Sequence, residues 1–304
     1  MSRKVSVIVN AGSGLGNDTA LIERVRALFE AAGADADVRL ARGGAEIGAA
    51  VDAALARTPD VIVAGGGDGT VSSVASRLAG SPVALGVLAL GTLNHFARDA
   101  GVPADLERAV GAIVEGRRVE VDIAEVNGRV FINNSGLGLY PDIVRHRERQ
   151  QRRLGRGKWP AFAWATLHAL RRFPFLRVRL VVDGDERVRR TPFVFIGNNE
   201  YRMDGFAIGE RRDLDRGRLS LYVAQRPGRL KLLMLALRAL TGRLRQARDF
   251  DAMGATEIVI ESRRKRLHVS ADGEVTTMTP PLHYRIRPRA LAVMLPDPAR
   301  ASGP

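Results

Sequence analysis

The chain has 304 residues, 45% of them hydrophobic and 5% aromatic, with 47 Lys and Arg against 33 Asp and Glu and no Cys. At roughly 100–200 residues per domain, this length predicts two domains with a core each. The apolar fraction excludes a disordered chain. The absence of Cys excludes a disulfide scaffold and a thiolate metal site, and it fits the cytosol.

Neither a signal peptide nor a membrane span is visible in the sequence. The first apolar stretch, residues 5–10, is too short for a secretory signal. The most apolar long segments, 159–176 and 230–240, contain Arg, His, Pro or Lys well short of the ~20 clean apolar residues that cross a bilayer. We therefore expect a cytoplasmic protein.

Positive charge is concentrated in the second half of the chain. Residues 1–140 hold 13 Lys and Arg against 16 Asp and Glu, which leaves 34 against 17, a net charge of +17, for residues 141–304. Such a field attracts polyanions or an anionic membrane surface. Solvated charges on an Arg-rich chain remain the alternative.

The first part of the chain alternates short apolar runs with longer amphipathic segments. Runs rich in branched residues predict strands at 5–9, 36–40, 61–64 and 83–90. Apolar residues at helical spacing predict helices at 19–32, 45–56, 70–78, 93–99 and 104–115. Strand and helix in alternation predict a parallel sheet with crossover helices.

From about residue 118 the pattern is one of hairpins, because Asn127-Gly128 and Asp183-Gly184 supply the positive φ angles of tight turns. Strands are expected at 119–126, 130–133, 191–196, 219–223, 256–260, 267–269 and 284–295, a further hairpin at 176–188 around Asp183-Gly184, and helical inserts at 143–172 and 229–248. The predicted fold class is α/β with two domains: a parallel α/β domain in residues 1–122 and a mostly antiparallel β-rich domain in 123–304. The last expected strand, 284–295, can pack against the first domain.

A glycine-rich segment follows the first expected strand, at Asn10-Ala11-Gly12-Ser13-Gly14. Backbone N–H groups between a strand and a helix can hold phosphate. The segment lacks the Gly-Lys-Ser/Thr of a Walker A loop, and Asn17 stands where a dinucleotide fingerprint has its third glycine. A plain structural turn explains this segment equally well.

A second segment, Gly65-Gly66-Gly67-Asp68-Gly69-Thr70, follows the third expected strand. Glycines let the backbone approach a bulky anion, and a lone carboxylate can bind Mg²⁺ through water. Open α/β sheets bind ligands at the carboxyl ends of their strands. We therefore predict a nucleotide or phosphate site here, although a turn or helix cap would also account for Asp68.

Two further segments complete the set. Thr92 and Asn94, after the fourth expected strand, can hydrogen-bond to phosphate or to water on a metal, or else cap a helix. Asp272 and Glu274 flank Gly273 far downstream, and two such carboxylates can act as a general base and an orienting group. Taken alone, Asp272-Gly273 reads as a hairpin turn.

These segments together resemble the diacylglycerol kinase catalytic-domain family, which includes soluble bacterial diacylglycerol kinases, sphingosine kinases and ceramide kinases. The resemblance spans residues 4 to about 295. It rests on Asn10-x-x-Ser13-Gly14, Gly66-Gly67-Asp68-Gly69-Thr70, Leu88-x-x-Gly91-Thr92-x-Asn94-x-Phe96-Ala97-Arg98 and Asp272-Gly273-Glu274, in this order.

The resemblance implies a lipid kinase that uses ATP and Mg²⁺, with residues 1–122 as the nucleotide-binding domain, residues 123–304 as the lipid-acceptor domain and the active site in the cleft between them. It implies catalytic roles for Asp272, Glu274 and Asp68. The nucleotide would contact Asn10, Ser13, Gly14, Gly66, Gly67, Asp68, Gly69, Thr70, Ser73, Thr92 and Asn94. The metal positions would be Asp68 through water, Asp122, and Asp215 in a structural site.

The sequence departs from the family pattern at several of these segments. Ala11 replaces the usual Pro, Leu15 a frequent Lys, Ser72-Ser73 the pair Asn-Glu, and His95 the Asp of Asn-Asp-Phe. Arg216 replaces the neighbouring acid beside Asp215. Two carboxylates and one lysine are absent together, which keeps the local charge balanced but leaves metal affinity and acceptor choice open.

A basic segment with aromatic residues predicts how such a protein reaches a lipid. Residues 145–158 hold seven Lys and Arg against one Glu, and aromatic residues follow. Basic residues beside Trp suit the headgroup region of an anionic membrane, so we expect reversible membrane association. The residues concerned are Arg145, Arg147, Arg152, Arg153, Lys158, Trp159 and Trp164. A core-packed helix with a solvated basic face is the alternative.

Three functions stay open at this stage. An ATP-dependent lipid kinase acting on a diacylglycerol-like, sphingoid or ceramide hydroxyl is preferred. An NAD kinase shares the Gly-Gly-Asp-Gly-Thr segment, and a membrane or nucleotide-binding protein with a decayed site would explain Leu15, Ser73 and His95. Nucleic acid is not an expected partner, since few aromatic residues accompany the basic ones outside 159–175. The choice of acceptor lipid and a homodimer stay open.

Overall fold

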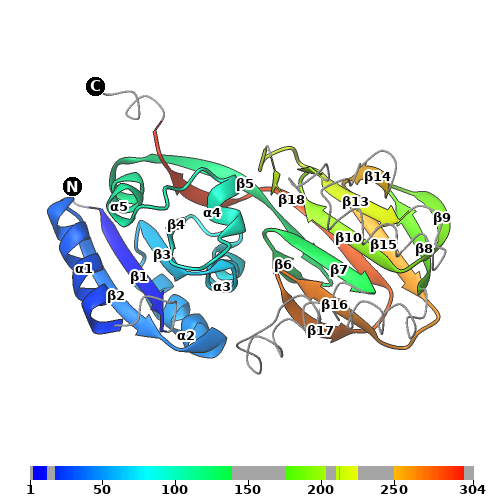
Figure 1. Cartoon of the computed structure of the whole chain (residues 1–304), viewed down its shortest axis with the longest axis horizontal. Helices are drawn as coiled ribbons and strands as arrows, with labels where there is room; N and C mark the ends of the chain where they lie inside the picture. The colour runs from blue at the N-terminus through cyan, green and yellow to red at the C-terminus, as the bar shows by residue number, and fades with distance from the viewer. Residues whose placement is uncertain are drawn as a thin grey trace, which may run out of the picture. The chain divides into compact units, whose positions relative to one another are not determined.

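The computed structural model describes residues 3–11, 18–138, 176–202, 210–211, 213–224 and 250–297. The chain divides into two compact units (Figure 1). Unit 1 consists of Met1–Ile123, Asp213–Asp215 and Arg287–Pro304, and unit 2 of Ala124–Arg212 and Arg216–Ile286. Both predicted helical inserts, 143–172 and 229–248, lie outside the described residues.

Unit 1 is a parallel sheet with helices, as the alternating pattern predicts. Its strands run in the order β2-β1-β3-β4, and β18 pairs in parallel with β4 through Val293 and Leu85. The strands are β1 Lys4–Asn10, β2 Asp35–Ala41, β3 Val61–Gly66, β4 Ala84–Ala89 and β18 Leu282–Leu295. The helices are α1 Asp18–Ala31, α2 Gly43–Leu55, α3 Asp68–Leu78, α4 His95–Asp99 and α5 Leu106–Glu115.

Helical spacing of apolar residues explains how these helices cover the sheet. In α1, Leu21, Val25 and Phe29 recur every four residues, and all three are buried in one cluster with Val7 and Val63 of the central strands. The strands β1 and β3 are buried on both sides, and their buried residues are apolar apart from Ser6, as expected of a parallel sheet covered on both faces. The carboxyl ends of β1, β3 and β4 therefore meet at one edge of this sheet.

Unit 2 is antiparallel. A six-stranded sheet has the order β14-β13-β10-β7-β16-β17, and β15 lies between β8 and the first part of β18. Strand β5, Arg117–Val126, runs from unit 1 into unit 2. The other strands are β6 Arg129–Phe131, β7 Asn134–Gly138, β8 Leu176–Val182, β9 Asp185–Thr191, β10 Phe193–Asn198, β11 Tyr201–Arg202, β12 Glu210–Arg211, β13 Leu219–Ala224, β14 Phe250–Ala255, β15 Glu257–Ser262, β16 Leu267–Ala271 and β17 Glu274–Met278.

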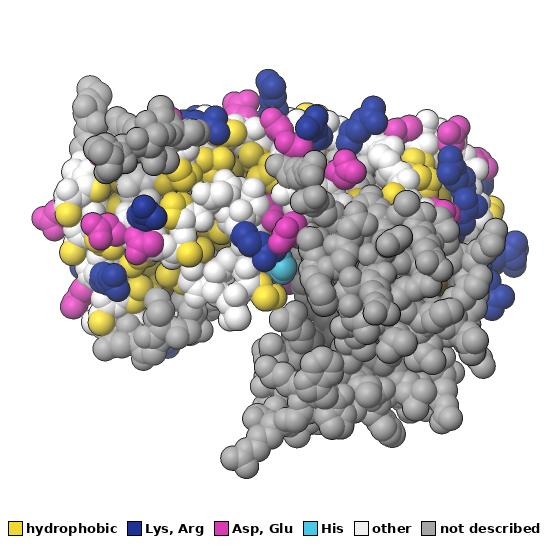
Figure 2. Space-filling view, turned by 45° about the horizontal axis from the view of Figure 1, so that its top comes forward, with side chains coloured by type: hydrophobic (Ala, Val, Ile, Leu, Met, Phe, Trp, Pro, Cys, Tyr) yellow, Lys and Arg dark blue, Asp and Glu magenta, His cyan; other side chains and the backbone are white. Residues whose placement is uncertain are grey.

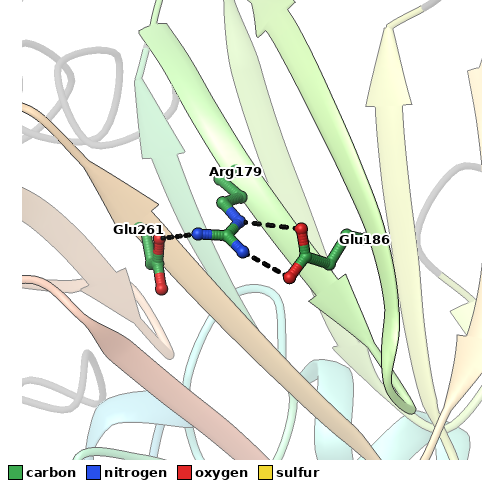
Figure 3. Close-up of polar contacts among 3 residues, drawn as sticks. All are labelled: Arg179, Glu186 and Glu261. Atoms are coloured by element: carbon green, nitrogen blue, oxygen red, sulfur yellow. Dashed lines mark hydrogen bonds and ion pairs between the residues drawn. The ribbon is translucent and has the colours of Figure 1, made fainter.

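Alternation along β8 illustrates how one face of these strands is buried. Val178 and Leu180 are buried in the core of unit 2, whereas Arg177 and Arg179 between them are exposed. The guanidinium of Arg179 bonds Glu186 of β9 on one side and Glu261 of β15 on the other (Figure 3). This exposed face is thus neutralised at Arg179.

The structure differs from the sequence predictions in a few strands. Helix α3 begins at Asp68 rather than at Thr70, and Gly65 and Gly66 belong to β3, so only Gly67 separates strand from helix. The strand predicted at 130–133 is interrupted after Phe131, and β7 begins at Asn134. The predicted strands include none that corresponds to β7, β11, β12, β14 or β17. Among the described residues, none of the helices combines the length and the hydropathy of a membrane span.

Candidate active site

The end of β3 forms a tight turn into α3. Gly66 is buried, and a Cβ there would overlap the hydroxyl of Thr70, which is itself buried. Gly67 is the N-cap of α3, with no side-chain cap, and its carbonyl accepts the N–H groups of Thr70 at 2.9 Å and Val71 at 3.1 Å. A helix N-terminus without a side-chain cap offers backbone N–H groups to an anion.

The turn after β4 packs directly on this one. A Cβ on Gly91 would overlap the Cα of Gly67 and lie 2.7 Å from Oδ1 of Asn94. Only glycine allows the two backbones to come this close. The glycine turns that follow β3 and β4 therefore form one continuous surface in unit 1.

Asn94 organises the second turn. It adopts a left-handed conformation with φ of 47°. Its Oδ1 accepts the N–H of Gly91 at 3.1 Å, and its Nδ2 donates to the carbonyls of Gly91 at 2.7 Å and Ala89 at 3.3 Å. Thr92, between them, is exposed. The amide of Asn94 is thus engaged by its own turn, while the hydroxyl of Thr92 faces solvent.

Asp68 connects the two turns through its side chain. It is half-buried in the first turn of α3, and its Oδ1 accepts the N–H of Phe96 at 3.2 Å. A carboxylate at a helix N-terminus is favoured by the helix dipole. Its second oxygen, Oδ2, accepts no hydrogen bond from the residues that the structure describes.

The other residues predicted to contact the nucleotide differ in position and exposure. Asn10 ends β1 and is half-buried, and Ser73 lies in α3, where its carbonyl accepts the hydroxyl of Ser76 at 2.9 Å. Gly69 is exposed at the start of α3. Ser13 and Gly14 lie outside the described residues.

In unit 2, the carboxylate of Asp272 is held by three backbone N–H groups. Oδ2 accepts from Ile132 at 2.8 Å, and Oδ1 accepts from Asn133 at 2.8 Å and Asn134 at 3.1 Å. The N–H of Asp272 donates to the carbonyl of Asn134 at 2.9 Å. This arrangement explains why the predicted strand breaks at residues 132–133: their N–H groups bind a carboxylate instead of a neighbouring strand.

Glu274 differs from Asp272 in its surroundings. It follows the left-handed pair Asp272 and Gly273, with φ of 47° and 85°, at the start of β17. Its Oε2 lies 2.6 Å from Nη2 of Arg129, and the Glu274 side chain is 65% exposed. Exposed ion pairs of this kind are worth about 0–1 kcal/mol, so Glu274 can exchange Arg129 for another partner.

Two of the predicted metal positions, Asp122 and Asp215, lie near each other in unit 1. Asp122 is 1% exposed, and its Oδ1 accepts the N–H of Arg289 at 2.9 Å. Its own N–H donates to the carbonyl of Leu214 at 2.7 Å, which brings the exposed Asp215 into the same neighbourhood. Within the described ranges, no cluster of three or more His, Asp or Glu side chains could hold a metal ion.

The sequence did not reveal a group of buried polar residues that surround residues 132–133, the residues whose N–H groups bind Asp272. Arg211, Asn133 and Asn198 are all buried, and they hydrogen-bond to one another around residues 132–133. A buried arginine is rare unless its donors are satisfied. No local pattern marks Arg211, which sits in a two-residue strand 61 positions before Asp272.

Two family models match the chain. Residues 4–126 match the diacylglycerol kinase catalytic domain, and residues 142–295 match the YegS C-terminal NAD kinase beta sandwich-like domain. The boundary between the two matches falls close to the end of β5, where unit 2 begins.

Curated relatives and a solved structure agree with these matches. A Klebsiella pneumoniae protein named "probable lipid kinase YegS-like" is 40% identical over 135 residues, 44% of this chain and 45% of its own length. A Bacillus subtilis diacylglycerol kinase is 32% identical over 145 residues, 47% of this chain and 48% of its own length. The chain thus spans about half the length of the curated relatives it matches.

The fold is shared with a crystal structure of a diacylglycerol kinase from Bacillus anthracis str. Sterne, with a TM-score of 0.71, 21% identity and 98% of each chain covered. At this identity the likeness shows the fold alone. With the catalytic-domain match in the first half and the YegS C-terminal match over residues 142–295, the chain belongs to the diacylglycerol kinase catalytic-domain family of lipid kinases.

Proposed function

We propose that this protein transfers the γ-phosphate of ATP to a hydroxyl group of a lipid. The observation that carries the proposal is the pair of glycine turns in unit 1, where Gly67 and Gly91 pack together and Asp68 links them. Phosphoryl transfer needs backbone N–H donors around the phosphates and positive charge near the γ-phosphate. The residues that bind the nucleotide have to supply little beyond these.

The phosphate donor fits this surface by its chemistry. The start of α3 offers N–H groups to an anion, Gly67 and Gly91 leave the backbone accessible, and the hydroxyl of Thr92 is exposed. Asp68 would hold Mg²⁺ through water, and the ion would neutralise charge on the phosphates when bound. Asn10, Ser13, Gly14 and Ser73 remain part of the proposed nucleotide site.

Asp272 and Glu274 have different proposed roles toward the lipid hydroxyl. Both oxygens of Asp272 already accept backbone N–H groups, so this carboxylate is suited to holding the turn. Glu274 is itself exposed and is bound by the half-buried Arg129 among the contacts above, so it is the better group to accept the proton of the lipid hydroxyl. We therefore assign the general base to Glu274 and a positioning role to Asp272.

Exposed basic residues support docking on an anionic membrane. Besides the segment 145–158, which lies outside the described residues, unit 2 carries four consecutive exposed cations between β15 and β16, Arg263, Arg264, Lys265 and Arg266. None of them forms an ion pair with a described residue. Figure 2 shows Lys and Arg side chains along the right-hand margin of the described surface, the side on which Figure 1 shows strands of unit 2.

The register of the strands places more positive charge beside this turn. Ser262, just before it, pairs with Val178 of β8, and Arg177 of β8 pairs directly with Arg190 of β9. Like charges opposite each other destabilise a sheet, and an anionic surface would offset that cost. At about 1 kcal/mol per basic residue near such a membrane, these residues suffice for reversible docking.

A direct assay tests the proposal. Purified protein is incubated with labelled ATP, Mg²⁺ and mixed micelles of diacylglycerol, monoacylglycerol, sphingosine or ceramide, and the labelled lipid is identified. We expect label in a diacylglycerol-like or sphingoid lipid with the wild type and none with Glu274→Gln. Equal labelling by Glu274→Gln would reject Glu274 as the base.

Because residues 142–295 match an NAD kinase beta sandwich-like domain, NAD is the alternative phosphate acceptor to be tested in the same assay. NAD is offered in place of lipid under the same conditions. Phosphorylation of NAD with no labelled lipid would replace the lipid kinase proposal by an NAD kinase. Absence of both products, together with unchanged ATP binding by Asp68→Ala, would favour a protein whose nucleotide site has decayed.

A further inference from the structure

We infer that Arg211 is a positioning residue for the proposed reaction. It holds the peptide group that binds the Asp272 carboxylate, and it thereby fixes the turn from Asp272 to Glu274. The inference rests on the proposed function in one respect, the assignment of Glu274 as the base. It names a side chain that no sequence motif marks, and it predicts a specific coupling between that side chain and Asp272.

The guanidinium of Arg211 is buried, with the residue 6% exposed. Nη1 donates to the carbonyl of Ile132 at 2.6 Å and, more weakly, to that of Asn198 at 3.3 Å. Nη2 donates to Oδ1 of Asn133 at 2.8 Å. A rigid fork of donors can reach the main chain at residue 132 and the side chain at residue 133 together, which a lysine ammonium cannot do with the same geometry.

Arg211 and Asp272 bind opposite sides of the same peptide group. The carbonyl oxygen of Ile132 accepts from Arg211, and the N–H of Asn133, which belongs to that same peptide, donates to the Asp272 carboxylate at 2.8 Å. A cation at the oxygen and an anion at the N–H polarise the peptide in the same sense. Hydrogen bonds arranged in this way strengthen one another.

One further contact fixes Arg211, and another fixes the carbonyl that it binds. Its guanidinium carbon lies 5.3 Å from the centre of the Tyr201 ring, in a cation–π arrangement. Nδ2 of Asn198 donates to the same carbonyl of Ile132 at 2.9 Å, so this oxygen accepts two hydrogen bonds. The peptide between residues 132 and 133 is therefore held on both sides by buried or half-buried groups.

The position of Glu274 follows from this arrangement. Asp272 is fixed by three N–H groups and by its own N–H to Asn134, and Gly273 completes the turn in a left-handed conformation. Glu274 is the next residue along the chain. A shift of the peptide that Asp272 grips would move Glu274, and a displacement of about 1 Å at a reacting group can cost about 10²-fold in rate.

The test is a kinetic comparison of the full-length protein and its variants in the labelled-ATP assay with micellar diacylglycerol. For Arg211→Lys and Arg211→Met we expect kcat to fall about 10- to 100-fold, with KM for ATP unchanged, because the nucleotide surface belongs to unit 1. Tyr284→Phe is the matched control: it removes a buried hydrogen bond of unit 2, to Ser135 at 3.1 Å, without touching residues 132–133. We expect this control to keep kcat.

Two readouts separate positioning from general loss of structure. Guanidinium ion added to Arg211→Ala should restore part of kcat and should do nothing for Glu274→Gln. In a double-mutant cycle, Arg211→Lys should add little to the loss caused by Asp272→Asn, because both act on one peptide. A folded Arg211→Met with wild-type kcat, or additive losses in the cycle, would overturn the inference.

The outcomes for the two proposals are distinguishable. If Glu274→Gln keeps full activity, the assignment of the base fails, whatever the Arg211 variants do. If Glu274→Gln is inactive while Arg211→Lys and Arg211→Met keep wild-type kcat, only the positioning role of Arg211 fails. If Arg211→Met does not fold, the cycle with Arg211→Lys decides.

Discussion

The Oδ1 of Asp68 accepts the backbone N–H of Phe96 at 3.2 Å, across 28 residues of sequence. Phe96 is 1% exposed, so this bond ties the start of α3 to the backbone of a buried residue of α4. The carboxylate therefore has a structural contact in addition to its proposed role near the phosphates. The two roles can be separated by substitution.

Asp68→Asn keeps an acceptor for the N–H of Phe96 but removes the charge, whereas Asp68→Ala removes both. We expect both variants to lose about 100-fold or more in phosphoryl transfer. Only Asp68→Ala should also lose stability, by roughly 1–2 kcal/mol, the cost of leaving a half-buried N–H without its partner. Steady-state kinetics and urea unfolding at the same pH measure the two effects. Equal activity of Asp68→Asn and the wild type would remove Asp68 from the proposed site.

Gly91→Ala should destabilise unit 1 because its Cβ meets backbone rather than a flexible side chain. The new methyl group would overlap Gly67 and press on Asn94, and we expect a loss of roughly 1–3 kcal/mol with weaker ATP binding. Gly69→Ala is the matched control, because a Cβ at Gly69 meets nothing within 4 Å and helix α3 gains a better helix former. Equal unfolding curves for the two variants would contradict the packing described for these turns.

The sequence predicted the parallel sheet, its helices and the hairpins at Asn127 and Asp183 because each is encoded locally, by apolar spacing or by a turn pair. The glycine turns were found for the same reason. The break between β6 and β7 was not, because its cause is Asp272, which lies 139 residues beyond Asn133. Arg211 was missed for the same reason: its hydrogen bonds to the carbonyl of Ile132 and to the side chain of Asn133 join residues nearly 80 positions apart, which leave no periodic signal.

The turn between β8 and β9 should give a measurable pH dependence of stability. Burial acts to raise the pKa of Asp183, but hydrogen bonds from the N–H of Glu257 and from the hydroxyl and N–H of Thr256 outweigh it and lower the pKa overall. A carboxyl group with a lowered pKa in the folded state contributes stability above its unfolded pKa of about 4, and that contribution is lost as the pH falls through the folded value.

Asp183→Asn should therefore be less stable than the wild type at pH 7, by less than about 1 kcal/mol because Asp183 is exposed to solvent, and the difference should shrink between pH 5 and pH 2. Urea unfolding across this range measures it. Asp185→Asn is the control in the same hairpin, since the Asp185 carboxylate makes no hydrogen bond or ion pair with the described residues, and we expect little change. A difference between wild type and Asp183→Asn that does not vary with pH would contradict the prediction.

Membrane docking should depend on the charges between β15 and β16. Replacing Arg263, Arg264, Lys265 and Arg266 by Gln should weaken co-sedimentation with vesicles containing anionic phosphatidylglycerol at least 10-fold at low salt. Binding by the wild type should fall as salt rises and be weak on phosphatidylcholine alone. The charge-matched control replaces four exposed arginines of unit 1 by Gln, Arg24, Arg26, Arg108 and Arg117. Equal weakening by both sets would show that net charge, and not this surface, drives docking.

Strand β18 begins in unit 2, where residues 282–285 pair with β15, and ends in unit 1, where Val293 pairs with β4. During synthesis on the ribosome, the parallel sheet of unit 1 therefore cannot receive β18 until unit 2 has been translated. The exposed edge of β4 must wait through the translation of unit 2, a period in which nascent chains commonly need chaperones. The topology thus fixes the order of assembly: the parallel sheet of unit 1 is translated first but is completed only after unit 2.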